Sequence, residues 1–353
     1  MKLKNIFNRM VIVGILILLQ LGLLVMVIWK LSTYFVYFYG ISVLLSAVVL
    51  LHLISTDQNP SYKLAWTIPI LLFPVFGGFF YILAGNAKMN KKLTKGLSEI
   101  YNRTVPFLQQ NPEIIEDIQK QDKNVANQAK YIKDFSLFPI YKNTSSEYLS
   151  PGEKFYEKLL EELKKAKHFI FLEYFIIQEG VMWDSILEIL EEKAEQGVDV
   201  RLIYDDIGCL KTLPYKYDER IRKSGIKCMV FNRLAPVISF IMNNRDHRKI
   251  TVIDGHTGFM GGINLADEYI NEYERFGHWK DAAIMLKGEA VWNLTMMFLQ
   301  MWELNHKVKE DYEMFKPYKY HPEPFESDGY VQPYGDSPLD HETVGENVYL
   351  NIL

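Results

Sequence analysis

The chain has 353 residues, a formal net charge of −4 and two cysteines. This acidic balance argues against a nucleic-acid-binding domain, which is normally clearly basic, and we expect no nucleic acid as a partner. Cys209 and Cys228 are too few for a disulfide framework, so we interpret them as buried thiols of a reducing compartment.

Two long uncharged segments lie near the N-terminus, at residues 10–29 and 33–53. Each has the roughly 20 residues needed to cross a bilayer core. We therefore predict that residues 1–57 contain two transmembrane helices, at about 10–29 and 33–54. A cleavable signal peptide is the alternative for the first segment, but its apolar run is too long and a second span follows it.

The positive charges around these segments predict their orientation. Lys2, Lys4 and Arg9 precede the first segment, whereas the turn between the two carries only Lys30. Because basic residues favour the cytoplasmic side, the N-terminus and the chain after the hairpin are both predicted to be cytoplasmic.

A third apolar segment at residues 64–83 is interrupted by prolines and glycines and is followed by the basic run KMNKKLTK at residues 88–95. A full span would place this basic run outside, against the positive-inside rule. We predict that residues 58–95 form a membrane-associated segment in the inner leaflet, with the basic run against anionic headgroups. A third complete span is the alternative.

The rest of the chain is predicted to contain one α/β domain. Residues 96–150 are polar and turn-rich and are expected to form a linker with short helices. Within residues 151–335, apolar strand-like runs alternate with amphipathic helical patterns. This alternation predicts a mixed, mainly parallel sheet with helices on both faces.

Two short segments of the chain resemble each other. PGEKFYEKLL begins at residue 151 and VGENVYLNIL begins at residue 344, and they share Gly, Glu, Tyr and Leu at matching places. A chance match is the alternative, because a convincing repeat needs more sequence. We interpret residues 336–353 as the start of a second, similar domain that the sequence leaves truncated.

The stretch DHRKITVIDGHTGFMGGIN at residues 246–264 carries the candidate chemistry. His247 and Lys249 are two residues apart on a predicted strand and so share one face. A neutral imidazole can attack phosphorus, and a neighbouring ammonium stabilises phosphoryl oxygens as their negative charge grows. Asp254 with Gly255 then predicts a turn that returns a second strand.

The returning strand brings Asn264 toward the same end, where its amide adds a neutral donor. Gly261 and Gly262 would let the backbone approach a bound phosphate closely. No metal-ligand cluster accompanies these residues, so we expect neither a metal nor another cofactor. A single histidine on a strand is usually structural, but the complete spacing H-x-K-x4-D-x6-G-G-x-N is far more specific.

This motif resembles the signature of the phospholipase D superfamily, and the chain is similar to bacterial cardiolipin synthases over nearly its whole length. The further stretches that carry the resemblance are the apolar hairpin, NPSYKLAWTIPILLFPVFGGFFYILAG, FIFLEYFII, VRLIYDDIG, GHWKDAAIMLKGEAVWNL and QPYGDSPLDHETVGENVYLNIL.

The resemblance implies a two-step phosphatidyl transfer at a bacterial cell membrane, with phosphatidylglycerol as substrate and anionic lipids as partners. His247 would be the nucleophile, Lys249 and Asn264 would bind phosphate, and Asp254 would orient or electrostatically support the motif. A second histidine would act as general acid and then as base. Glu173, in FIFLEYFII, would line the site or support it from behind, with a purely structural hydrogen bond as the alternative.

The chain departs from the family pattern in having one H-x-K-x4-D motif where the family has two. His278 also has a lysine two positions on, Lys280, but Met285 stands where the aspartate should be. We therefore expect an incomplete chain that is inactive or weakly active alone and needs a second phospholipase D-like half. The alternatives are a half-size phosphodiesterase or nuclease that works as a homodimer, and a non-enzymatic membrane remnant.

Overall fold

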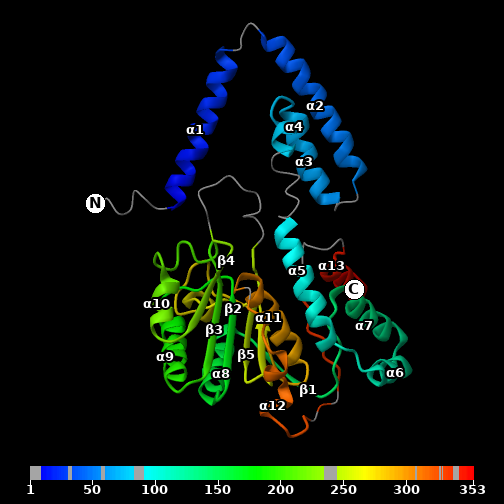
Figure 1. The fold of residues 1–353 in the computed structure, drawn as a ribbon, viewed down its shortest axis with the longest axis vertical. Helices are drawn as coiled ribbons and strands as arrows, with labels where there is room; N and C mark the ends of the chain where they lie inside the picture. The colour runs from blue at the N-terminus through cyan, green and yellow to red at the C-terminus, as the bar shows by residue number, and fades with distance from the viewer. Residues whose placement is uncertain are drawn as a thin grey trace. The chain divides into compact units, whose positions relative to one another are not determined.

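The structure, a computed structural model, describes residues 9–30, 34–56, 60–82, 91–233, 245–306, 308–325, 327, 329–336 and 342–353. The chain divides into two compact units. The first contains the N-terminal helices, and the second contains an α/β domain that begins at Lys92 (Figure 1).

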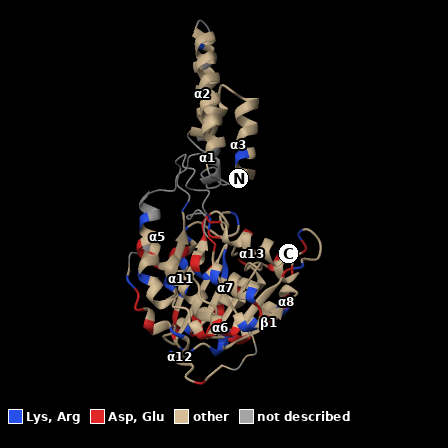
Figure 2. Ribbon diagram, turned by 90° about the vertical axis from the view of Figure 1, so that its right-hand side faces the viewer, with Lys and Arg blue, Asp and Glu red and all other residues tan. Residues whose placement is uncertain are grey.

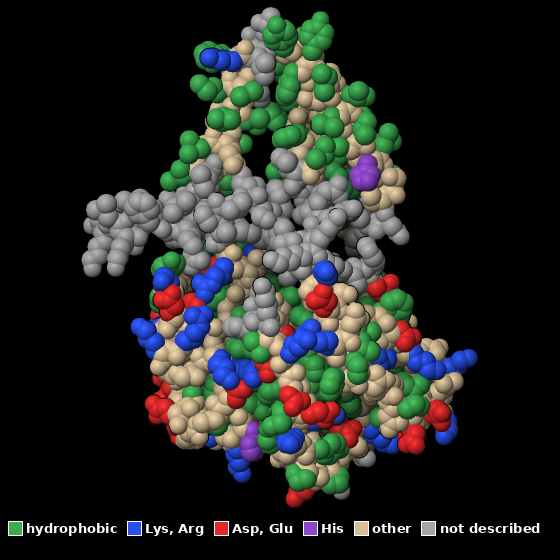
Figure 3. Space-filling model, in the orientation of Figure 1, with side chains coloured by type: hydrophobic (Ala, Val, Ile, Leu, Met, Phe, Trp, Pro, Cys, Tyr) green, Lys and Arg blue, Asp and Glu red, His purple; other side chains and the backbone are tan. Residues whose placement is uncertain are grey.

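The first unit contains two long helices at the predicted transmembrane positions, α1 (Arg9–Lys30) and α2 (Phe35–Ser55). Among the described residues, one helix, α2, is both long enough and apolar enough to cross a membrane. A shorter apolar stretch lies at Ile17–Val27 within α1. Figure 2 shows the positions of charged residues concentrated in the α/β unit, and Figure 3 shows the exposed hydrophobic side chains of these helices.

The third apolar segment is broken, as its prolines and glycines predict. It forms α3 (Pro60–Leu72) and the short α4 (Gly77–Phe80), and both pack against α2. Ser46 Oγ of α2 donates to Pro74 O at 2.7 Å and accepts from Gly78 N at 3.1 Å. A helix of 13 residues is about 20 Å long, which is too short for a bilayer core of about 30 Å. Residues 83–90, which include the start of the predicted basic run, lie outside the described part.

The second unit is built on a seven-stranded sheet with the order β1-β7-β6-β5-β2-β3-β4. The strands are β1 (Thr144–Leu149), β2 (Phe169–Tyr174), β3 (Asp199–Asp205), β4 (Lys227–Phe231), β5 (Lys249–Ile253), β6 (Thr257–Gly261) and β7 (Ala283–Gly288). The α/β class and the mixed sheet are confirmed.

The expectation that the sheet is mainly parallel is corrected by the strand pairing. β2–β3 and β3–β4 are parallel, whereas the other four neighbouring pairs are antiparallel. Helices cross over between β2, β3 and β4, and such crossovers permit parallel pairing. A tight turn joins β5 to β6, and a turn of that length forces antiparallel pairing.

Helices cover both faces of the sheet, as predicted. One face packs against α8 (Gly152–Lys165), α9 (Val181–Glu195) and α10 (Tyr217–Lys223), and the other against α11 (Val291–His306). The alternation of β2 divides its side chains between these cores: Leu172 and Tyr174 face α8 and α9, whereas Phe171 faces α11. Glu173 therefore also points to the α11 face.

The region predicted to be a linker contains α5 (Lys91–Thr104), α6 (Pro112–Gln121) and α7 (Lys123–Ser136). It also contains β1, which pairs with β7 and so belongs to the sheet. The sequence TSSEYL does not indicate a strand, because it has no alternation of apolar and polar residues. Four of its six side chains are exposed at the edge of the sheet. The predicted repeat segments are both helical, α8 and α13 (Val344–Ile352), and α13 packs against α7.

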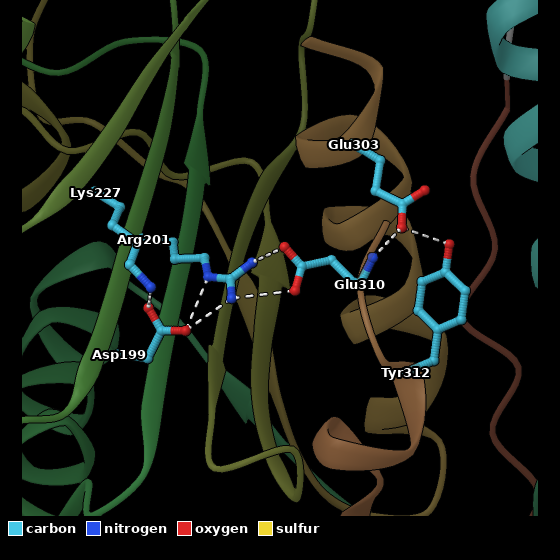
Figure 4. Close-up of polar contacts among 6 residues, drawn as sticks. All are labelled: Asp199, Arg201, Lys227, Glu303, Glu310 and Tyr312. Atoms are coloured by element: carbon cyan, nitrogen blue, oxygen red, sulfur yellow. Dashed lines mark hydrogen bonds and ion pairs between the residues drawn. The ribbon is translucent and has the colours of Figure 1, made fainter. Parts of the chain in front are cut away.

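An ion-pair network fixes the segment after α11 against the sheet (Figure 4). Arg201 of β3 pairs with Asp199 and with Glu310, and Glu303 of α11 accepts hydrogen bonds from Glu310 N and Tyr312 Oη, both at 2.8 Å. A cavity of about 470 Å³ lies beside this network, next to the edge strand β4. Its arginines and Lys227 are neutralised by carboxylates, so it offers little charge to a ligand.

Candidate active site

The motif histidine lies where β5 begins, beside the carboxyl end of β2. Lys249 opens β5 and pairs with Tyr174, the last residue of β2, because these two strands run antiparallel. His247 stands in the segment that leads into β5 rather than within the strand. The carboxyl end of β3 adjoins the same place, because β3 runs parallel to β2.

The side chains of His247 and Lys249 meet at one aromatic ring, that of Phe175. The ring centroids of His247 and Phe175 are 4.7 Å apart, and Lys249 Nζ lies 5.3 Å from the Phe175 ring centroid. Lys249 Nζ also donates to the backbone oxygen of His247 at 2.7 Å. The structure therefore brings together the two residues that would attack and bind a phosphate.

Electrostatics keeps this histidine neutral. His247 is exposed at the surface, but part of its side chain is buried. This partial burial is the larger cause that lowers the pKa of its imidazole, and the positive charge of Lys249 is the second. Among the described residues, none donates to or accepts from its ring nitrogens. A neutral imidazole with a free nitrogen is the form that can act as a nucleophile.

Lys249 lies in a position that disfavours its charged form. Only 6% of its surface is exposed, and burial lowers the pKa of its ammonium to about 8, although Asp246 and Asp281 act in the opposite direction. In the described part of the chain, no carboxylate lies within ion-pairing distance of its Nζ. A buried cation without a counter-ion gains most from an arriving anion such as a phosphodiester.

Asn264 lies close behind this pair. It is buried, its Oδ1 accepts from Ile176 N at 3.0 Å, and its Nδ2 donates to Tyr269 Oη at 2.7 Å. Ile176 directly follows Phe175, so Asn264 anchors the segment that carries the shared ring. An amide nitrogen has two hydrogens, and among the described residues Tyr269 alone accepts from this one.

The glycine pair makes a close approach, but to protein rather than to open space. A Cβ at Gly261 would lie 2.5 Å from Ala282 O, and a Cβ at Gly262 would lie 2.2 Å from Asp281 Oδ1. Gly262 N also donates to Ala282 O at 3.0 Å. The glycines thus allow the segment before β7 to bring Asp281 toward Lys249.

The structure does not bring Asp254 to this cluster. Asp254 lies five positions after Lys249, a distance of roughly 16 Å at the rise of a β-strand. Its carboxylate accepts hydrogen bonds from the backbone N–H groups of Lys167, His168 and Phe169 at 2.8–2.9 Å. Asp254 therefore ties the turn between β5 and β6 to the start of β2.

Glu173 is buried on the opposite face of the sheet from Lys249. Its Oε1 accepts from Arg248 Nη1 at 3.3 Å. Arg248 stands between His247 and Lys249 in the chain, and its side chain points the other way because neighbouring residues alternate. Glu173 thus supports the motif from behind and does not touch its front face.

Comparison with known families agrees with this arrangement. Residues 159–302 match the family described as cardiolipin synthase, PLD-like domain, and residues 44–86 match the family described as phospholipase D-nuclease N-terminal. The chain belongs to the phospholipase D superfamily.

Three curated relatives support this membership. An uncharacterized protein of Streptococcus mutans serotype c is 45% identical over 86% of this chain and 65% of its own length. Cardiolipin synthase 2 of Bacillus anthracis is 33% identical over 70% of this chain and 48% of its own length. The cardiolipin synthase of Alkalihalophilus pseudofirmus is 34% identical over 70% of this chain and 49% of its own length. The chain spans about half to two thirds of the length of these relatives.

Sequence reasoning missed several residues around the phospholipase D motif. Phe175 had no distinguishing signal, because an aromatic residue at a strand end is usually core. Asp205 and Asp246 were detectable: Asp205 ends a parallel strand, where ligand sites of α/β sheets gather, and Asp246 adjoins His247. Asp205 accepts from Ile207 N, Gly208 N and Asp246 N at 2.8–3.2 Å, and so orders the approach to the motif.

Proposed function

We propose that this protein is a membrane-bound phosphatidyltransferase that joins two phosphatidylglycerol molecules into cardiolipin and glycerol through a phosphohistidine on His247. One observation carries the proposal: an exposed, neutral imidazole and a buried ammonium lie against one ring at a strand end, and no carboxylate among the described residues pairs with that ammonium. The match to the cardiolipin synthase PLD-like family and the similarity to two curated cardiolipin synthases support the choice of lipid substrate.

In the first step the His247 imidazole attacks the phosphorus of one phosphatidylglycerol, and the bond to the headgroup glycerol breaks as that oxygen takes a proton. The terminal hydroxyl of a second phosphatidylglycerol then attacks the phosphohistidine and gives its proton to the second histidine, which now acts as the base, and His247 leaves. Lys249 and the remaining N–H of Asn264 neutralise the negative charge that grows on the phosphoryl oxygens. Asp254 contributes by holding β5 in register with β2, which sets where His247 and Lys249 lie.

The proton for the leaving glycerol has to come from a second acid. Of the eight histidines, His247 alone carries the complete H-x-K-x4-D spacing. We infer that a second phospholipase D-like half supplies the other histidine, as a further domain or as another copy of this chain. General acid catalysis of this kind is worth about 10²–10⁴ in rate.

The N-terminal helices would place this chemistry at the membrane. In this proposal α1 and α2 cross the bilayer as a hairpin, and α3 with α4 dips into the inner leaflet. The α/β domain then works on the cytoplasmic side of a bacterial cell membrane, where anionic lipids are its substrates and partners. The length of α2 and its uncharged composition support the anchor.

The test is conversion of phosphatidylglycerol in reconstituted vesicles. We expect little cardiolipin from the chain as a monomer, and formation of cardiolipin when a second phospholipase D-like half with its own H-x-K-x4-D motif, on another protein or on another copy of this chain, is present. His247→Ala should abolish this product. Equal activity of His247→Ala, or vigorous turnover by a strict monomer, would contradict the proposal.

The mass of the protein in detergent then separates the two possible sources of the second half. If another copy of this chain supplies it, the active form is a dimer. In that case, mixing His247→Ala with wild-type protein lowers the activity through mixed dimers, because each site needs both histidines.

A further inference from the structure

Behind the motif, on the α11 face of the sheet, two acidic side chains are buried together. Glu173 of β2 is fully buried, and Asp246 is 4% exposed. In the described part of the chain, Glu173 Oε2 and Asp246 Oδ2 are both buried without a hydrogen-bond partner. Two neighbouring carboxyl groups, each with an unpaired oxygen in a dry interior, are costly unless a proton lies between them.

The remaining contacts of this pair come from Arg248. Its Nη1 donates to Glu173 Oε1 at 3.3 Å and to Met297 O of α11 at 3.4 Å, and its backbone N donates to Asp246 Oδ1 at 3.3 Å. Asp246 N in turn donates to Asp205 Oδ2 at 3.2 Å. The side chains of Asp246 and Arg248, on either side of His247, are thus fixed on the α11 face. Because neighbouring side chains alternate, the His247 side chain lies on the opposite face of the sheet.

The charges of the cluster favour one bound proton. Three carboxyl groups, those of Asp205, Asp246 and Glu173, face two guanidinium groups, those of Arg245 and Arg248. Tyr101 of α5 is the other titratable group that acts on Arg248. Burial raises the pKa of Glu173, the Asp246 carboxylate raises it further, and Arg248 lowers it. With one proton on the pair, two negative charges face two positive ones.

We propose that Glu173 and Asp246 share one proton at neutral pH and that this neutral-acid–carboxylate pair, clamped by Arg248, is the positioning element that holds the His247 segment at the end of β2. Glu173 donates through Oε2 to Asp246 Oδ2, which satisfies both orphaned oxygens. The consequence for His247 rests on the function proposed above, whereas the shared proton itself does not.

The test is infrared spectroscopy of the full chain in detergent at neutral pH, without substrate and without a second half. A protonated carboxyl group absorbs apart from carboxylates, so the shared proton gives one carboxylic-acid band per chain. We expect Glu173→Gln to remove that band. Glu162→Gln is the matched control and keeps it, because Glu162 is also buried, at 3% exposed, but is ion-paired with Lys165 and Lys287 at 2.9 Å.

Asp246→Asn separates sharing from burial. Without the Asp246 charge, Glu173 is left beside Arg248 and ionises, so the band disappears in this variant too. A band that stays at full strength in Asp246→Asn, or no difference between wild type and Glu173→Gln, would overturn the proposal. Neither result depends on phosphatidyl transfer, so a failure here and a failure of the proposed function are distinguishable.

Stability gives a second readout. A carboxyl group whose pKa is higher in the folded than in the unfolded state favours folding at low pH, and this contribution is lost as pH rises above the unfolded value of about 4.3. Relative to Glu173→Gln, the folding equilibrium constant of the wild type should therefore fall by up to about tenfold for each unit that the pH rises, until Glu173 ionises. Parallel pH curves for the two proteins would contradict the shared proton.

Discussion

Lys249 Nζ donates to the backbone oxygen of His247 at 2.7 Å, so the ammonium of the second motif residue reaches back over the first. This contact leaves two ammonium hydrogens for a ligand and fixes them next to the imidazole. In the described part of the chain, the lysine forms no ion pair with a carboxylate. Its position therefore favours binding of an anion more than it favours the stability of the folded protein.

The first prediction concerns the stability cost of Lys249. Its pKa of about 8 lies below the unfolded value of about 10.4, so the charged side chain disfavours folding below pH 8, and stability recovers as pH rises between the two values. Lys249→Met keeps the apolar stem against Phe175 and removes the charge. We expect the free energy of unfolding at pH 7 to rise by about 1–3 kcal/mol, measured by urea unfolding. A less stable variant would contradict this account.

The same substitution should damage catalysis. Removing a preorganised donor to a developing oxyanion typically costs about 10²–10³ in kcat. We therefore expect Lys249→Met to lose activity by that factor in membranes that also contain a second phospholipase D-like half. A variant that is both more stable and fully active would show that Lys249 does not bind the phosphate.

The pH dependence of kcat/KM should be bell-shaped. The reaction needs His247 neutral, so the acid limb falls below the ordinary histidine value of about 6.5 because burial and Lys249 lower this pKa. It also needs Lys249 protonated, so the alkaline limb falls near pH 8. Lys249→Arg should move the alkaline limb upward, because arginine stays charged. An unmoved alkaline limb would assign it to another group.

Asp254 is expected to act through stability. Its two oxygens accept three backbone N–H groups, whereas an asparagine has one acceptor oxygen and would turn its amide toward a donor. Asp254→Asn should therefore lower the free energy of unfolding by about 2–4 kcal/mol. Asp122→Asn is the control: this exposed helix cap keeps its function with either residue, so its unfolding should be almost unchanged.

Gly262 should tolerate no side chain. A Cβ there would lie 2.2 Å from Asp281 Oδ1, so Gly262→Ala has to displace the Asp281 carboxylate, which accepts from Ala282 N at 2.8 Å and from Trp279 Nε1 at 3.3 Å. We expect a loss of about 1–3 kcal/mol, the usual cost of overpacking. At Gly329 no atom lies within 4 Å of an added Cβ, so Gly329→Ala should unfold like the wild type. Equal effects of the two substitutions would show that the close approach at Gly262 is not required.

Much of the fold was predictable because its signals are local. Uncharged length located α1 and α2, proline and glycine predicted the break between α3 and α4, and the alternation of apolar strands with helices predicted the α/β class. The exposed edge strand β1 gave no such signal, because its partners lie far away in the sequence. The direction of β5, β6 and β7 also depends on turns and tertiary pairing rather than on local pattern.

The candidate site, too, was predictable only where its signals are local. Strand periodicity placed His247 and Lys249 together, and the structure brings them to one ring. Asp254 belongs to the same motif, yet it lies at the far end of β5, because spacing along a strand says nothing about which end carries the chemistry. Phe175 became visible only through the pairing of β2 with β5, whereas Asp246 was detectable as the neighbour of His247 and the structure adds its burial.

The most direct test of the central claim is to trap the covalent intermediate. The protein, with a second phospholipase D-like half present, is mixed briefly with phosphatidylglycerol labelled at its phosphorus, quenched, digested and analysed by mass spectrometry. We predict an acid-labile phosphatidyl group on His247, absent from His247→Gln and reduced in Lys249→Met. A label on any other residue, or cardiolipin formation with His247 never modified while His247→Gln remains active, would contradict the account.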